Sequence, residues 1–227
     1  MRANHIRGSR YSALLCLGLV VLISILAFGE SAGAPFLNWD DDRNFVANED
    51  FRGVGADQFR WAWDTYHLGV WQPLSWLLFG VQWQVGGLQP LVYHGVSLAL
   101  HALNCMLFYL LLRRLLSPNP QNSNVPPDGA IDFAAIAGTV LFACHPLRVE
   151  PVVWISCQPY LPAVACYLLS ILAYLQVYSD PHRPRYVWYL ASFGCFAAAV
   201  MFKAVAVSLP AVFLILDLYV LRRREAG

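Results

Sequence analysis

Residues 11–28 read YSALLCLGLVVLISILAF, an unbroken apolar run that is long enough to cross a bilayer as a helix. Three arginines precede it within the first ten residues. The same arrangement is typical of a secretory signal peptide, and residues 32–34 (AGA) mimic a cleavage site. Pro35 would follow the cut, where signal peptidase performs badly, so we predict that this first helix is not removed.

The rest of the chain is also rich in apolar residues. Of its 227 residues, 58% are hydrophobic and 13% are charged, and the mean hydropathy is +0.50. This composition excludes an ordinary soluble domain. A formal charge of +1 gives no reason to expect a nucleic-acid partner. None of the six cysteines forms a CxxC pair, so neither a zinc site nor a disulfide framework is indicated.

We therefore expect a single all-α, polytopic membrane domain over residues 1–227, with about six transmembrane helices. The predicted spans are residues 11–28, 91–112, 131–146, 159–178, 186–202 and 205–221. Between the first two spans lies an external loop, 29–90, which is long enough to carry function. Its Trp-rich segment 71–85 is too short to span and predicts a helix at the membrane interface. Residues 113–130 form a polar, proline-containing cytoplasmic linker.

The distribution of positive charge predicts the orientation. With the N-terminus in the cytoplasm and six crossings, ten of the 15 basic residues are cytoplasmic although the cytoplasmic stretches are short. These are Arg2, Arg7, Arg10, Arg113, Arg114, Arg183, Arg185, Arg222, Arg223 and Arg224. Acidic residues fall mainly on the other side. We expect a protein of the cell (inner) membrane with both termini in the cytoplasm.

An acidic cluster, Asp40, Asp41 and Asp42, follows the first span and lies next to Trp39. Adjacent carboxylates repel one another, and apolar neighbours add a desolvation penalty to the charged form. A carboxylate in this setting can act as a general base that takes a proton from an incoming hydroxyl. The alternative is that the three aspartates only solvate the end of a helix.

A second polar motif, residues 145–150 (HPLRVE), lies where a later span ends. The prolines at 146 and 151 favour a break in the helix there. His145, Arg148 and Glu150 are candidate substrate-binding residues, because an arginine suits a phosphate and a His/Glu pair can orient an acid. The alternative is a polar interfacial turn.

Lys203 lies between two long apolar segments and emerges on the external side. A lysine there anchors the helix at the interface or contacts a lipid-linked phosphate. His94 and His101 share a helix face two turns apart, too far apart for joint metal ligation, and we expect packing or hydrogen bonding. An all-Asp cluster could bind a divalent metal, but we do not expect a metal site.

Several motifs in fixed order resemble one family. They are residues 36–43 (FLNWDDDR), 71–76 (WQPLSW), 93–94 (YH), 101–104 (HALN), 141–150 (LFACHPLRVE) with Trp154, 202–203 (FK), 208–210 (SLP) and 216–217 (LD). Together they resemble bacterial tetratricopeptide-repeat membrane proteins of the GT-C glycosyltransferase type, to which the animal transmembrane-tetratricopeptide O-mannosyltransferases look related. The resemblance covers nearly the whole chain and corresponds to the N-terminal membrane part of the family.

The resemblance implies transfer of a sugar from a polyprenyl-phosphate donor to an acceptor hydroxyl, of a protein or glycan, on the external face. The general base of the family maps onto Asp41 or Asp40, and we favour Asp41. No cofactor other than the lipid-linked donor is implied.

Two departures from the family pattern leave a second reading open. Residues 156–160 read SCQPY where the family has a charged stretch, and the chain ends soon after its sixth span. On this ground the chain is expected to be a truncated form or a fragment, and the alternative function is an inactive membrane scaffold or assembly partner. A transporter finds little support, because Asp217 is the main ionisable residue inside a span.

Overall fold

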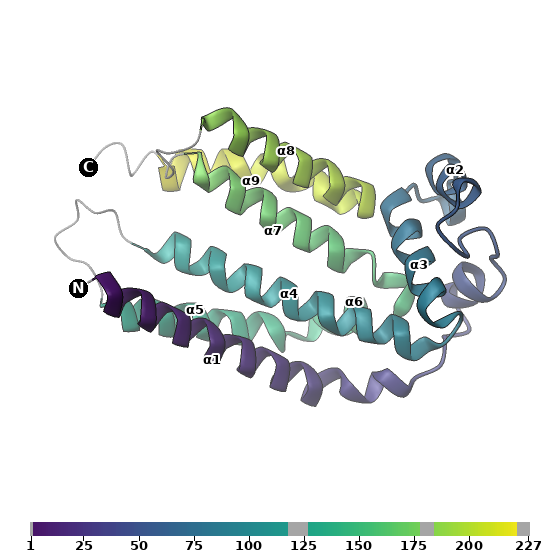
Figure 1. The fold of residues 1–227 in the computed structure, drawn as a ribbon, viewed down its shortest axis with the longest axis horizontal. Coiled ribbons are helices and arrows are strands. Elements are labelled where there is room, and N and C mark those ends of the chain that lie inside the picture. The colour runs from purple at the N-terminus through teal and green to yellow at the C-terminus, as the bar shows by residue number, and fades with distance from the viewer. Residues whose placement is uncertain (1, 118–126, 178–183, 222–227) are drawn as a thin grey trace.

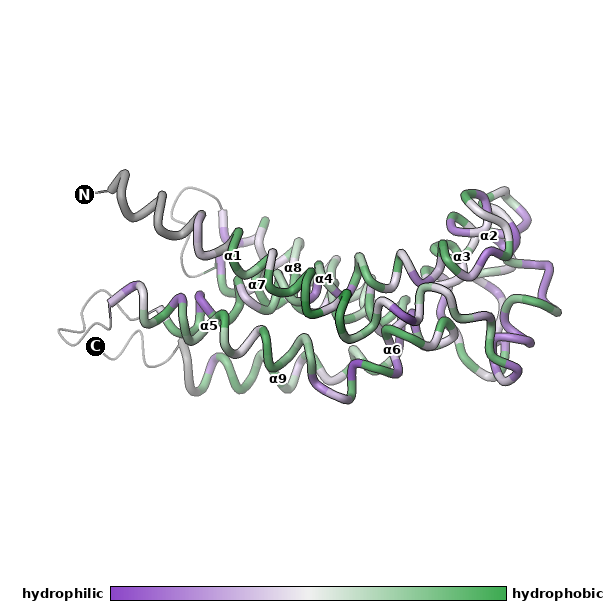
Figure 2. Tube along the Cα trace, turned by 90° about the horizontal axis from the view of Figure 1, so that it is seen from below, coloured by the Kyte–Doolittle hydropathy of each residue, from purple (hydrophilic) through white to green (hydrophobic). Residues whose placement is uncertain are grey.

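The computed structural model describes residues 2–117, 127–177 and 184–221, which contain helices and no β-strand. The principal helices lie side by side in an elongated bundle (Figure 1). They are α1 (Arg2–Phe28), α4 (Pro90–Leu116), α5 (Asp128–Ala143), α7 (Tyr160–Gln176), α8 (Arg185–Phe202) and α9 (Leu209–Ile215). Figure 2 shows hydrophobic residues along the bundle and many hydrophilic ones at the end where α2 (Ala56–Asp64) and α3 (Pro73–Gly86) lie.

Four segments of the described chain are long and apolar enough to cross a membrane: Leu14–Gly33, Pro90–Leu116, Ile155–Gln176 and Arg185–Phe202. A fifth is a pair, Asp128–Ala143 and Pro146–Val153, bent by 58° at the break that the prolines predict. The predicted sixth span contains a shorter apolar helix, Ala204–Leu218. The fold class, an all-α polytopic membrane protein, is confirmed. By length and hydropathy, four or five segments of the described chain can span a membrane.

The predicted last span is divided into three short pieces. A 3₁₀ turn, η6 (Ala204–Ser208), precedes α9, and a π-helical turn, η7 (Leu216–Leu221), follows it. The Asp217 carboxylate accepts hydrogen bonds from the Tyr174 hydroxyl, at 2.8 Å to each oxygen. The predicted cytoplasmic residues Arg222 to Arg224 lie outside the described residues, as do residues 118–126 of the predicted cytoplasmic linker.

Helix α4 organises the bundle, because it packs against α1 and α5 on one side and α7 on the other. Cys16 and Cys105 are buried between α1, α4 and α5. Leu107, Leu168 and Leu209 belong to a second core between α4, α7 and α9. Inside a bilayer such close packing stabilises helix association by van der Waals contact, since lipid is as apolar as the side chains themselves.

The long loop folds into a compact cap at one end of the bundle (Figure 1). Its elements are η1 (Gly29–Gly33), the π-helical turn η2 (Asp42–Val46), α2, η3 (His67–Gly69) and α3. Helix α3 confirms the helix predicted over residues 71–85. The opposite end of the bundle carries the start of α1, the end of α4 and the start of α5 (Figure 1).

Aromatic side chains hold the cap together. Phe45 packs edge-on against Phe79 with ring centroids 4.8 Å apart, and Trp61 packs against Trp76 at 5.2 Å. Only 1% of the Trp76 surface is exposed. We expected the Trp-rich segment 71–85 to lie at the membrane interface, but Trp76 is a core residue of the cap, because four aromatic rings of the loop pack against its side chain.

Gly80 lets the loop backbone pass close to α3. A Cβ atom at this position would lie 2.1 Å from the carbonyl oxygen of Gly53, far inside van der Waals contact. Gly53 itself has a φ of 122°, a conformation that favours glycine. These two glycines therefore set how tightly the cap closes on α3.

Three short elements connect α5 to α7 at the same end of the bundle as the cap. They are η4 (Pro146–Arg148), α6 (Val149–Val153) and η5 (Ile155–Cys157). Gln158, which follows them, is fully buried and donates to the Tyr93 carbonyl and the Ser97 hydroxyl, both at 2.8 Å. It also accepts a hydrogen bond from Gln82 at 2.7 Å. The α6–α7 connection is thereby fixed to both α3 and α4.

Candidate functional site

A polar cavity of about 480 Å³ lies between the cap and the α6–α7 connection. The cap contributes Asp40, Arg43, His67 and Gln72 to its lining. The bundle contributes Glu150, Trp154, Ser156, Cys157, Tyr160 and Lys203. Two carboxylates and two cations therefore face one space, although they come from segments more than 100 residues apart in the chain.

Three of the predicted site residues, Asp40, Glu150 and Lys203, meet in this cavity. His145 and Arg148 are not among the residues that line it. The exposed His145 accepts a hydrogen bond from the backbone N–H of Leu147 at Nδ1, at 3.2 Å, and so caps the turn η4. The Arg148 guanidinium lies over the Phe142 ring, 4.7 Å from its centroid. Both side chains therefore contact α5 or the turn η4 and do not line the cavity.

Asp41 has a different environment from Asp40. Only 1% of the Asp41 surface is exposed, whereas Asp40 is half-buried and faces the cavity. One Asp41 carboxylate oxygen accepts the Leu37 N–H at 3.0 Å. The other accepts the Ser156 N–H at 2.9 Å and also the Ser156 hydroxyl. A buried carboxylate needs such donors to offset the loss of water.

Lys203 is a single extended residue between α8 and η6, and it lines the cavity. Its Nζ donates to Gln72 Oε1 at 3.3 Å and lies 5.0 Å from the centroid of the Tyr160 ring. Desolvation by burial lowers the pKa of Lys203, while the nearby Cys157 and Asp40 oppose this shift. An ammonium held this way has lost part of its hydration, so an anionic ligand would stabilise its charged form.

Residues 156–160, which depart from the family pattern, build much of the cavity wall. The Cys157 thiol donates a hydrogen bond to Glu150 Oε1 at 3.5 Å, and the Tyr160 ring lies against the Lys203 ammonium. Sequence reasoning singled out none of Arg43, Gln72 or Tyr160 as site residues. Signals existed for Arg43 and Gln72, which lie in the FLNWDDDR and WQPLSW motifs, whereas Tyr160 lies in the stretch that departs from the family pattern.

His67 lines the cavity from the turn η3. Its ring packs edge-on against Trp76 with centroids 5.2 Å apart. Burial lowers the pKa of His67, and a backbone hydrogen bond involving Arg43 and the charge of Asp50 act in the opposite direction. The next residue, Leu68, has a φ of 50°, which is rare outside glycine and costs free energy. The cap therefore stores strain at the cavity rim.

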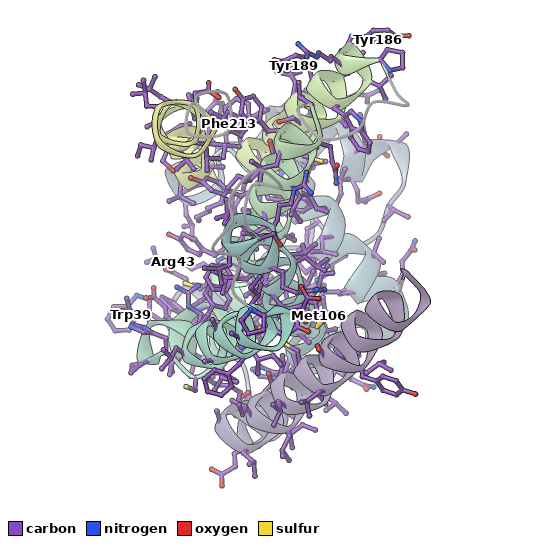
Figure 3. The ribbon with its side chains drawn as sticks, turned by 90° about the vertical axis from the view of Figure 1, so that its left-hand side faces the viewer. Trp39, Arg43, Met106, Tyr186, Tyr189 and Phe213 are labelled. Carbon is purple, nitrogen blue, oxygen red and sulfur yellow. The ribbon has the colours of Figure 1, made fainter. Side chains whose placement is uncertain are left out.

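An apolar groove of about 370 Å³ adjoins the polar cavity. Leu37, Asn38, Trp39 and Trp154 line it, and Trp154 also lines the cavity. Trp39 is 74% exposed, and its side chain projects on the same side of the molecule as Arg43 (Figure 3). A ligand with a charged head and an apolar tail fits this pair of adjoining spaces.

Among the described residues, no three His, Cys, Asp or Glu side chains gather as a metal-ion site. His94 and His101 make the hydrogen bonds that we expected. The Nε2 atom of His94 lies 3.3 Å from the Ala34 carbonyl, and that of His101 lies 3.2 Å from the Ala143 carbonyl.

Known proteins similar to this chain are O-mannosyltransferases. Protein O-mannosyl-transferase Tmtc3 of Drosophila melanogaster is 27% identical over 164 residues, which is 67% of this chain and 18% of that protein. Tmtc1 of the same organism is 34% identical over 144 residues, 60% of this chain and 15% of the relative. TMTC2 of Homo sapiens is 29% identical over 196 residues, 82% of this chain and 22% of the relative.

The chain thus covers between 15% and 22% of the length of these relatives. No protein-family model matches it, and no solved structure matches it. The predicted relation to the animal O-mannosyltransferases is confirmed as homology over this part of their length, whereas the relation to bacterial proteins stays a prediction.

Proposed function

We propose that this chain forms a glycosyltransferase site that moves a sugar, with mannose as the first candidate, from a polyprenyl-phosphate donor to a hydroxyl of a protein acceptor. The observation that carries the proposal is the cavity in which Asp40 and Glu150 face Lys203 and Arg43. The relatives are protein O-mannosyltransferases, and this activity suggests the sugar and the acceptor class.

In this proposal the carboxylate of Asp40 is the general base. It takes the proton of the acceptor hydroxyl while the hydroxyl oxygen bonds to the anomeric carbon. The bond from that carbon to the phosphate oxygen breaks on the opposite face, so that configuration inverts, and polyprenyl phosphate leaves with the electron pair. Asp41, the base that we favoured from sequence, already accepts three hydrogen bonds and is closed to an acceptor.

Positive charge in the cavity suits the leaving phosphate. Lys203 is partly desolvated, so its attraction for an anion is stronger than that of a lysine in water. Arg43 lines the same cavity and adds a second cation. Glu150, on the bundle side, is positioned to hydrogen-bond sugar hydroxyls. No cofactor besides the lipid-linked donor enters the reaction.

The adjoining groove supports a lipid-linked rather than a soluble donor. Its lining is largely apolar and opens beside Trp154, where the polar cavity begins. A polyprenyl chain would bury apolar surface there, while a nucleotide would leave its base and ribose hydroxyls without partners. Membrane lipids and the acceptor are the remaining partners.

We place the cavity on the external face of the cell (inner) membrane, with both termini cytoplasmic. The predicted charge asymmetry of the connecting segments supports this orientation. The clustering of the cavity residues at the end opposite the start of α1 agrees with it (Figure 1).

The direct test compares two donors in membranes that contain the chain. We expect mannosyl transfer to a serine/threonine peptide from mannosyl-phosphopolyprenol and none from GDP-mannose. A photoreactive polyprenyl phosphate should also label the chain, and excess unlabelled lipid phosphate should compete. The double variant Asp40→Asn/Glu150→Gln is the matched control, which removes both carboxylate charges but keeps the side-chain shapes. Transfer from GDP-mannose, or equal transfer by the double variant, would refute the proposal.

A further inference from the structure

The buried Asp41 carboxylate connects two parts of the chain that are 115 residues apart. Its partners are the N–H of Leu37, in the cap, and both donors of Ser156, at the α6–α7 connection. Asn44 adds to the connection, because its Nδ2 donates to the Ser156 hydroxyl at 2.9 Å. Ser156 thus accepts from one cap residue and donates to another, and its backbone is fixed by η5.

The Asp41 contacts determine where Asp40 points. Residues 40 and 41 lie in one helical turn, and Asp41 has helical φ and ψ of −62° and −35°. Successive side chains in a helix point about 100° apart around the axis. Fixing the Asp41 side chain against Ser156 therefore turns Asp40 toward the cavity. Upstream, His94 holds the Ala34 carbonyl at 3.3 Å and restrains the entry to this turn.

We propose that Ser156 is a positioning residue: by holding Asp41 it keeps the Asp40 carboxylate aimed into the cavity. The reacting group and the holding group are thereby separated onto neighbouring aspartates. The sequence stretch 156–160, which lacks the charges of the family pattern, contributes to the site through this contact. The inference deepens the proposed function and rests on it for the transfer measurement below.

The first experiment needs no enzymatic activity. Asp40→Cys is introduced into the full chain with Cys144 and Cys157 replaced by alanine, and labelling by a membrane-impermeant maleimide is timed. Adding Ser156→Ala should raise the labelling rate several-fold, because the turn is no longer held. Ser156→Thr keeps the hydroxyl and should leave the rate near that of the parent. Ser170→Ala, which removes a buried hydroxyl bonded to the Ser192 carbonyl at 2.7 Å, is the matched control far from the cavity.

The second experiment measures transfer from mannosyl-phosphopolyprenol by chains that carry the natural Asp40. Ser156→Ala should lower kcat by about 10- to 100-fold, the scale of a misplaced reacting group, with KM for the donor nearly unchanged. Ser156→Thr should restore kcat, and the Ser170→Ala variant should match the parent.

The labelling rate and kcat together test whether Ser156 positions Asp40. Faster labelling and lower kcat in Ser156→Ala, both reversed by threonine, would support it. Unchanged labelling in Ser156→Ala, or equal acceleration by Ser170→Ala, would overturn it. If the parent chain transfers no sugar while the labelling pattern holds, the proposed function fails and the positioning of residue 40 stands.

Discussion

The acidic segment 38–42 and the turn 145–150 lie at the same end of the bundle but use their polar residues differently. From the first, Asp40 faces the cavity and Asp41 holds the cap in place. From the second, only Glu150 lines the cavity, while His145 caps a turn and Arg148 lies over Phe142. Two polar residues at the same end of the bundle therefore need not line the same cavity. Local backbone direction decides which side chain meets a ligand.

The largest effect expected from a single cavity residue other than Asp40 is on donor binding by Lys203. Lys203→Gln should weaken binding of a polyprenyl phosphate by about 10- to 100-fold, the scale of one hydrogen bond to a charged group. The measurement is a competition titration against the photoreactive lipid. Arg60→Gln is the control, because Arg60 pairs with Asp57 at 3.7 Å on the exposed surface of α2. Equal loss in both variants would mean that general surface charge, not the cavity, binds the lipid.

The two halves of the turn 145–150 should respond differently to substitution. Glu150→Gln should lower transfer by about 10-fold, because it removes a charge that faces the sugar. His145→Ala removes an exposed cap of a short turn and should leave transfer close to the parent value. Initial rates at saturating donor separate the two. A larger loss of transfer rate in His145→Ala than in Glu150→Gln would show that His145, not Glu150, contributes to the site.

The cap should lose stability when it is overpacked at Gly80. Gly80→Ala places a methyl group against the Gly53 carbonyl and should destabilise the fold by about 1–3 kcal/mol. Gly95→Ala is the control in α4, where no neighbouring atom lies within 4 Å of the new Cβ. That variant should be neutral or slightly stabilising. Unfolding of both proteins in mixed micelles gives the comparison, and equal stability would contradict the tight contact between the cap and α3.

The smallest effect should be seen in the pH dependence of stability. Burial lowers the pKa of His67 in the folded chain below its ordinary value of 6.5, so the unfolded chain binds the proton more readily. The neutral ring therefore contributes fully to the free energy of unfolding above pH 6.5. This contribution is lost as the pH falls toward the lowered pKa of His67 in the folded chain. His67→Gln should therefore flatten the decline of the unfolding temperature between pH 7 and pH 5. An unchanged slope would show that His67 titrates alike in both states.

Sequence alone predicted most of the helical architecture because long apolar runs have few alternatives in a membrane. Segment 205–221 is less regular, since it contains Pro210 and divides into a 3₁₀ turn, a short helix and a π-helical turn. The aromatic core of the cap was not predicted. Tryptophan suits both an interface and a core, and only the tertiary contacts of Trp76 decide between them.

The site was predicted in part for a related reason. Three of the candidate residues, Asp40, Glu150 and Lys203, line one cavity, but neighbouring aspartates are equivalent in a linear pattern, and we favoured Asp41 as the base. The choice between Asp40 and Asp41 depends on Ser156, which lies far along the chain. Arg148 was assigned to a phosphate from its chemistry, yet the bend after α5 places it against an aromatic ring.

The central claim, that Asp40 reacts and Asp41 holds, is tested most directly by comparing Asp40→Asn with Asp41→Asn for both sugar transfer and unfolding. We expect Asp40→Asn to unfold like the parent and to lose transfer by about 10²- to 10⁴-fold, the usual contribution of a general base. Asp41→Asn should be destabilised by about 1–3 kcal/mol, because its amide would face the N–H group of Leu37 or Ser156. Undiminished transfer by Asp40→Asn, or a stability loss confined to that variant, would contradict the division of roles.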